Sequence, residues 1–198
     1  MISSPLSEQL RQLRQFVHRH LRDVHGCHGF DHVERVCQLA EWLGKRMNAR
    51  LDVLLPAAWL HDVGHAATDN ASHHEASLRT ARELLPTLGF APETVQAILT
   101  CIAEHRFSSG RAPSTLESQI LSDADKLDAL GAIGIARAFA FCGEHGRDLA
   151  DGVQHFHDKL LRLERMMHTP PAQRLARRRT QFMRLFLERF AREAVAEE

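Results

Sequence analysis

The stretch LLPAAWLHDVGH, residues 54–65, joins an apolar helical pattern to a short run of polar side chains. Leu54, Ala57 and His61 are spaced three and four residues apart, which is the spacing of one face of an α-helix. This spacing predicts that His61 points into the protein interior. Asp62 follows at about 100° around the same helix. Both side chains are costly to bury unless they are paired, hydrogen-bonded or bound to metal.

The helical periodicity continues through the rest of the chain. Apolar stripes predict helices over about residues 6–21, 33–47, 54–61, 73–85, 92–106, 117–130, 131–143, 153–167 and 172–192. The sequence shows no sustained strand alternation, internal repeat or low-complexity block. It therefore predicts an all-α fold, a single-domain bundle of about eight or nine helices.

The overall composition is that of an ordinary globular protein with one anomaly. The 198 residues are 44% hydrophobic and 25% charged, which excludes disordered and fibrous classes. The formal net charge is +0, so no global attraction to nucleic acid or membrane surfaces is expected. The anomaly is 14 histidines against no tyrosine. Neutral imidazole is a common metal ligand, so this excess favours a metal site.

Cysteine usage and hydropathy both favour a cytoplasmic protein. None of the four cysteines, Cys27, Cys37, Cys101 and Cys142, forms a CxxC pair. A chain of this size does not need disulfides, so reduced thiols are expected. The first residues contain no apolar signal-peptide core. No apolar run approaches the ~18 residues that span a bilayer, so no membrane association is expected.

Three segments contain side chains that suit one divalent cation. They are HGFDHVERV at 28–36, AAWLHDVGH at 57–65 and SDADKLDALGAIGIAR at 122–137. A single inward histidine is more often a hydrogen-bonded core residue than a ligand. Two imidazoles and two carboxylates from three helices, however, form a mixed N/O set. Such a set suits Mn, Fe, Co, Ni or Zn better than Ca, which prefers oxygen ligands.

The ordered segments resemble the HD-domain metal-dependent phosphohydrolases, whose pattern is H…HD…D on an all-α fold. The resemblance is stronger to small, stand-alone bacterial nucleotide phosphohydrolases and pyrophosphohydrolases. HGFDHVERV, LHDVGH, EHRF and DADKLDALGAIGIAR carry it in order, from about His28 to Arg137. It implies one HD domain over 1–198, with a metal-binding core at about 28–137 and C-terminal helices at 150–192 packed on it.

The resemblance also implies the cofactor and its ligands. One divalent ion is expected, with Mn favoured among Mn, Fe, Co, Ni, Zn and Mg. The implied ligands are His32, His61, Asp62 and Asp125. Asp123 and Asp128 flank the last of these, and Asp125 is preferred because the family's aspartate is followed by a basic residue, here Lys126.

The activity implied by the resemblance is hydrolysis of a nucleotide through a metal-activated water. Nucleoside triphosphate pyrophosphohydrolase and phosphatase activities both fit, and Asp62 is a candidate for orienting the water. His65 stands where some relatives use a glutamate in acid–base chemistry. The alternative is that His65 lies at a helix C-terminus, with Gly64 marking the helix end. Lys126 is a candidate for neutralising phosphate charge, or else for an ion pair with an acidic neighbour.

Further residues are candidates for binding phosphate. Arg35 lies one helical turn after His32. His105 is three residues after Ile102 and on the same predicted inward face. It is suited to binding phosphate, protonating a leaving group or ligating a second metal. The same roles are open to His73 and His74. His74 and His105 together would complete a dinuclear site, although one ion is the default expectation.

Other classes of function remain open on the sequence alone. A non-catalytic sensor that binds metal and nucleotide is one alternative. A dinuclear HD enzyme, either a cyclic-nucleotide phosphodiesterase or a diiron oxygenase, is another. The basic run at 174–184 is more typical of a solvated helix face than of nucleic-acid binding, which a neutral chain does not favour. The last helix also carries apolar residues that suit a core or the seam of a possible homodimer. They are Phe182, Leu185, Phe186 and Phe190.

Overall fold

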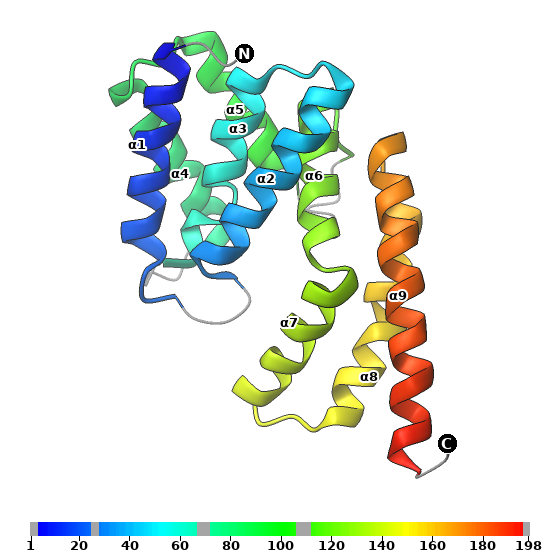
Figure 1. The fold of residues 1–198 in the computed structure, drawn as a ribbon. Coiled ribbons are helices and arrows are strands. Elements are labelled where there is room, and N and C mark those ends of the chain that lie inside the picture. Colours follow the sequence, from blue (N-terminus) through cyan, green and yellow to red (C-terminus); the bar gives the residue numbers. More distant parts are fainter. Residues whose placement is uncertain (1–3, 25–27, 67–71, 106–111, 196–198) are drawn as a thin grey trace. The chain divides into compact units, whose positions relative to one another are not determined.

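The fold was taken from a computed structural model that describes residues 4–24, 28–66, 72–105 and 112–195. Across these ranges the chain forms nine α-helices and no strand, which confirms the predicted all-α class (Figure 1). Cys27 and residues 106 and 107 of the EHRF motif lie outside the described residues. The chain divides into two compact units, residues 1–125 and 126–198.

The first unit contains the helices that carry the HD motif. In chain order they are α1 (Ser4–Leu21), α2 (Phe30–Met47), α3 (Leu51–Leu60), the 3₁₀ helix η2 (Val63–Ala66), α4 (His73–Thr87), α5 (Pro92–Glu104) and most of α6 (Leu116–Asp128). Ser72 caps α4, because its Oγ accepts a hydrogen bond from the Glu75 amide at 3.2 Å. This cap fixes His73 as the first residue of α4.

Helix α3 is the centre of the first unit. Its residues 53–60 are all buried, and the helix packs against α1, α2 and α5. A helix that is apolar on every side is buried on every side. The chain that leaves it at His61 therefore starts inside the protein, as the spacing of Leu54, Ala57 and His61 predicts.

The second unit is built on a cluster of phenylalanine rings. It contains the end of α6, α7 (Gly131–Glu144), α8 (Leu149–Asp158), the 3₁₀ helix η4 (Leu160–Met166) and α9 (Pro170–Ala194). Phe139 lies within 5.9 Å of the ring centroids of Phe156, Phe186 and Phe190. Phe182 and Leu185, on the same helix as the last two, are exposed. The predicted packing of C-terminal helices on the metal-binding core stays a prediction.

Among the boundaries that differ from those expected from the sequence, two concern the C-terminal helices. The stripe over 153–167 forms two elements instead of one helix, because α8 ends at Asp158 and η4 follows. The last helix begins at Pro170 rather than near residue 172. Proline suits the first helical position, whose amide has no intrahelical partner, so Pro170 and Pro171 form the start of the helix.

The remaining expectations from composition concern thiols and membranes. Cys37, Cys101 and Cys142 are buried and form no disulfide. Within the described ranges, none of the helices combines the length and apolar character needed to cross a bilayer.

Candidate metal centre

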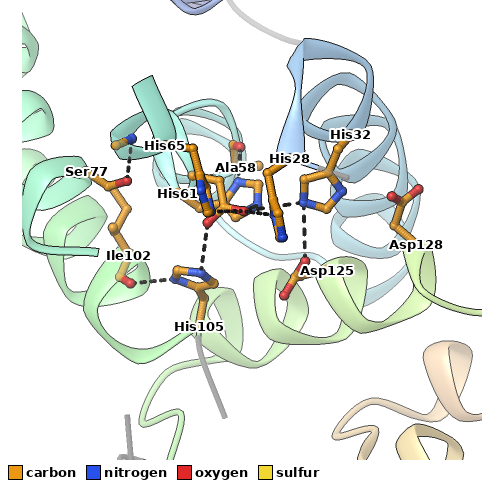
Figure 2. Close-up of polar contacts among 12 residues, drawn as sticks. His28, His32, Ala58, His61, His65, Ser77, Ile102, His105, Asp125 and Asp128 are labelled. Atoms are coloured by element: carbon orange, nitrogen blue, oxygen red, sulfur yellow. Dashed lines mark hydrogen bonds and ion pairs between the residues drawn. The ribbon is translucent and has the colours of Figure 1, made fainter. Parts of the chain in front are cut away.

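The polar cluster lies in the first unit, where three helices end or begin (Figure 2). His32 is in the first turn of α2, and His61 and Asp62 directly follow α3. Asp125 comes from the last turn of α6. The imidazoles of His32 and His61 are buried, while 34% of the Asp125 side chain is exposed. The cluster is therefore closed toward the core and open at Asp125.

The distances within this cluster suit the donors of one cation. His32 Nε2 lies 3.6 Å from Asp62 Oδ2 and 3.5 Å from Asp125 Oδ1. His61 Nε2 lies 3.8 Å from Asp62 Oδ2. One ligand atom each from His32, His61 and Asp125 lies within 4.8 Å of the others. The structure thus brings together all four residues expected as ligands.

The tautomer of His61 is set by the backbone. Its Nδ1 lies 2.8 Å from the carbonyl oxygen of Ala58. A carbonyl only accepts, so Nδ1 donates, and a neutral ring keeps its lone pair on Nε2. This Nε2 is buried and makes no hydrogen bond among the residues that the structure covers. Such an atom is costly unless a ligand fills the space before it, and a divalent cation fits.

The ring planes of the two imidazole ligands also favour a shared ion. The planes of His32 and His61 are inclined by 64°, with centroids 5.5 Å apart. Their in-plane lone pairs can therefore converge on one point. With two carboxylates beside them, this donor set suits Mn, Fe, Co, Ni or Zn.

Asp62 is the carboxylate on which the imidazoles of the cluster converge. Burial raises the pKa of Asp62, but the neighbouring His61, His28, His32 and His105 outweigh it and hold the pKa well below its usual range. Asp62 is therefore ionised at neutral pH. His105 reaches its other oxygen, with Nε2 at 3.8 Å from Oδ1. The Nδ1 of His105 donates to the Ile102 carbonyl at 2.7 Å, so its Nε2 also faces the cluster.

His65 lies beside Asp62 but not at the end of an α-helix. Helix α3 ends at Leu60, and His65 belongs to η2, with Nε2 at 3.6 Å from Asp62 Oδ2. The alternative in which Gly64 marks a helix end is wrong. A Cβ on Gly64 would lie 1.9 Å from the His73 carbonyl oxygen, so glycine is required by the close approach of α4. The Gly64 amide donates to Ser77 Oγ at 2.9 Å.

One histidine in contact with this cluster was not singled out from the sequence, namely His28, whose Nδ1 lies 3.1 Å from Asp62 Oδ2. His73, a candidate from the sequence, stacks on His65 with ring centroids 4.2 Å apart. His28 stands in the HGFDHVERV motif, four residues before His32. That i, i+4 spacing was the available signal, but it predicts a shared face only within a helix, and α2 begins at Phe30.

The other candidate residues are placed as follows. Arg35 is half-buried in α2, one turn after His32. Lys126 is 7% exposed and is the first residue of the second unit. The His74 ring lies 5.7 Å from the His105 ring, but His74 belongs to none of the described groups of donors within 4.8 Å. Roles for these residues in binding phosphate or a second ion stay predictions.

The buried histidines predict acid sensitivity of the metal-free protein. Burial lowers the pKa of His105 to about 4, with a further lowering from His61, and burial also lowers the pKa of His65 to about 4. Unfolded histidine takes up a proton near pH 6.5, which these folded rings resist. Stability should therefore fall as pH decreases from about 6.5 toward 4. Thermal unfolding in EDTA across this pH range measures the effect, and His105→Asn should reduce the dependence of Tm on pH. If Tm depended on pH as strongly in His105→Asn as in the wild type, His105 would not be a source of the acid sensitivity.

Comparison with known proteins supports the same interpretation. The HD domain family model matches residues 29–130. The Bacillus subtilis protein YpgQ is 33% identical over 194 residues, covering 94% of each chain. The crystal structure of B. subtilis YpgQ in complex with ADP has a TM-score of 0.82 at 32% identity, covering 96% of each chain. An HD-superfamily hydrolase from Bacillus thuringiensis has a TM-score of 0.80 at 32% identity, covering 97% of this chain and 100% of that one.

The matched segment begins just before His32 and ends after Asp125, so it contains every residue of the H…HD…D pattern. Its all-α architecture is that of the HD-superfamily hydrolases. The chain belongs to the HD domain family.

Proposed function

We propose that this protein is a divalent-metal-dependent phosphohydrolase that acts on nucleotides, most simply as a nucleoside triphosphate pyrophosphohydrolase or phosphatase. The observation that carries the proposal is the cluster of His32, His61, Asp62 and Asp125, in which each side chain lies within 3.8 Å of another member. The nucleotide class is supported by the ADP complex of YpgQ, which is 32% identical to this chain.

The four clustered residues would hold one divalent ion, with Mn favoured. When bound, such an ion lowers the pKa of a coordinated water toward neutrality and polarises a phosphoryl oxygen. His61 contributes an imidazole whose tautomer is preset by Ala58. Asp62 contributes a carboxylate that is already ionised and that can also accept a hydrogen bond from the attacking water. Asp125 lies on the exposed side of the cluster, from which a substrate would reach the ion.

The proposal assigns further roles to residues around the ligands. His65 lies 3.6 Å from Asp62 and is 21% exposed, so it can exchange a proton with substrate or solvent. His105 presents Nε2 toward Asp62 Oδ1 and is suited to contact phosphate. Lys126 and Arg35 are proposed to compensate phosphate charge, because phosphoryl transfer needs cations near the transferred group.

A product-resolved screen tests the proposal. Purified protein is incubated with nucleoside mono-, di- and triphosphates and with Mn²⁺, Mg²⁺, Co²⁺, Ni²⁺ or Zn²⁺, and phosphate and pyrophosphate are measured separately. Release of either product that depends on the metal supports a phosphohydrolase. Tight nucleotide binding without any product across the panel would instead favour a sensor that binds metal and nucleotide without turnover.

A dinuclear enzyme is the second candidate, because His105 Nε2 lies 3.8 Å from Asp62 Oδ1, whereas His32 and His61 approach Oδ2. Together with His74, His105 would ligate a second ion for cyclic-nucleotide hydrolysis or diiron oxidation. We expect one ion per chain, measured as metal content after dialysis against metal-free buffer. A ratio near two would replace the single-ion mechanism with the dinuclear one. The predicted cytoplasmic location and possible homodimer stay predictions.

A further inference from the structure

Three imidazole rings form a column beside Asp62. His28 and His65 stack with centroids 4.2 Å apart and planes inclined by 13°. His65 and His73 stack in the same way, at 4.2 Å and 15°. The column comes from three separate segments: the stretch two residues before α2, the 3₁₀ helix η2 and the first residue of α4. We call His28, His65 and His73 the imidazole column.

Distance alone would make part of this column a second metal site. One ligand atom each from Asp62, His65 and His73 lies within 4.8 Å of the others. Ring orientation argues against it. An imidazole nitrogen binds metal along a lone pair that lies in the ring plane, and two nearly parallel, stacked rings direct their lone pairs side by side. Unlike the planes of His32 and His61, inclined by 64°, these planes do not meet at a point within bonding reach.

The column contacts the proposed metal ligand instead. His28 Nδ1 lies 3.1 Å from Asp62 Oδ2, and because a carboxylate oxygen accepts, Nδ1 is the donor. The His28 side chain is 47% exposed, so its own surroundings restrain it little. Its ring plane is fixed by stacking on His65, whose side chain is only 21% exposed. Figure 2 shows the His28 and His65 rings side by side.

We propose that the imidazole column is a positioning device for Asp62: His28 donates the hydrogen bond that orients the carboxylate, and stacking through His65 and His73 holds His28 in place. The inference rests on the proposed role of Asp62 as a metal ligand. Hydrogen bonds to metal-ligating groups fix their orientation and raise metal affinity. The column thus sets how tightly the site binds its ion without ligating one itself.

Direct metal binding, measured without nucleotide, tests the proposal. Mn²⁺ titration of the purified protein gives the Kd and the number of ions per chain. His28→Ala should weaken binding roughly 10- to 100-fold, the usual effect of losing a partner of a metal ligand. His28→Asn restores a donor at the position of Nδ1 and should recover most of the affinity. If His28→Asn bound Mn²⁺ as weakly as His28→Ala, the hydrogen-bond role would be overturned.

His73 distinguishes stacking from ligation. His73→Ala should weaken Mn²⁺ binding several-fold, and His73→Phe should restore it, because phenylalanine stacks on His65 but cannot bind metal. The number of ions per chain should be the same in all variants. A Phe variant that matches the Ala variant, or that loses one ion per chain, would overturn the column and assign His73 as a ligand.

A matched control comes from the second unit. His145 also stacks on an aromatic ring, that of Phe141 at 4.0 Å, and is exposed. His145→Ala should leave the Mn²⁺ Kd unchanged, and circular dichroism shows that each variant is folded. Because no substrate is present, a chain that binds Mn²⁺ but hydrolyses nothing would contradict the proposed function and leave this inference standing.

Discussion

Replacing Asp62 with asparagine is expected to abolish tight Mn²⁺ binding and to lower kcat/KM for nucleotide hydrolysis at least roughly 1,000-fold, or about 4 kcal/mol of transition-state stabilisation. Asparagine keeps the shape of the side chain but removes its charge. Asp62 Oδ2 lies within 3.8 Å of the imidazole nitrogens of His28, His32, His61 and His65. No neighbouring group can replace the Asp62 carboxylate, because the side chains around Oδ2 are imidazoles.

The Asp62→Asn experiment needs two measurements and one control. Mn²⁺ titration reports the loss of a ligand, and steady-state kinetics at saturating Mn²⁺ reports the loss that excess metal does not repair. Asp31→Asn is the matched control, because Asp31 precedes His32 in the chain but is exposed and lies outside the cluster. It should behave as the wild type. Retention of Mn²⁺ affinity within a few-fold in Asp62→Asn would remove Asp62 from the ligand set.

The position of His61 follows from helical periodicity, whereas its partners do not. The apolar stripe through Leu54 and Ala57 is enough to direct His61 inward. His32 and Asp125 lie on other helices, and spacing along the sequence does not say which helices meet. Their choice depends on the order of the motif in a known family. The structure brings them within 3.5 Å of each other.

The imidazole column could not be read from the sequence for a different reason. His65 and His73 are joined by a segment of seven residues and stack only because η2 packs against α4. No helical or strand period relates such positions. His28 lay within a recognised motif, yet it precedes the helix, so its i, i+4 relation to His32 did not apply.

The break between α8 and η4 shows a limit of periodicity itself. Phe156, Leu160 and Leu163 continue one apolar stripe and are all buried. A 3₁₀ helix has about 3.0 residues per turn, so residues three apart lie on the same side of it. In an α-helix, residues three apart lie on nearly the same side. A spacing of three or four residues therefore predicts the buried face in both elements but does not reveal the point at which one replaces the other.

The Gly64→Ala substitution is expected to be the most destabilising single-methyl change in the metal-binding region. An added Cβ would lie 1.9 Å from the His73 carbonyl oxygen, 2.6 Å from the Ser77 amide nitrogen and 2.9 Å from the Ala76 Cβ. Two of these atoms are backbone of α4 and cannot rotate away. The helix must move, at a cost of roughly 3 kcal/mol or more, at the upper end of overpacking effects.

Thermal unfolding measures this cost against an internal reference. For a chain of this length about 1 kcal/mol corresponds to roughly 2–4 °C, so Gly64→Ala should lower Tm by about 6–12 °C. Gly143→Ala is the matched control: Gly143 is helical in α7, and its Cβ would meet nothing within 4 Å. Alanine is favoured over glycine in helices by up to about 1 kcal/mol, so this variant should unfold at the same or a higher temperature.

Gly64→Ala should also disturb the metal site, which a general loss of stability would not do. Gly64 lies between Asp62 and His65, and its amide is tied to Ser77. If α4 is pushed away from η2, His73 moves with it, and the imidazole column loses its last ring. Gly64→Ala should therefore weaken Mn²⁺ binding even at temperatures where the protein remains folded, whereas Gly143→Ala should not. Equal Tm and equal Mn²⁺ affinity in the two variants would show that the contact between η2 and α4 is looser than the structure has it.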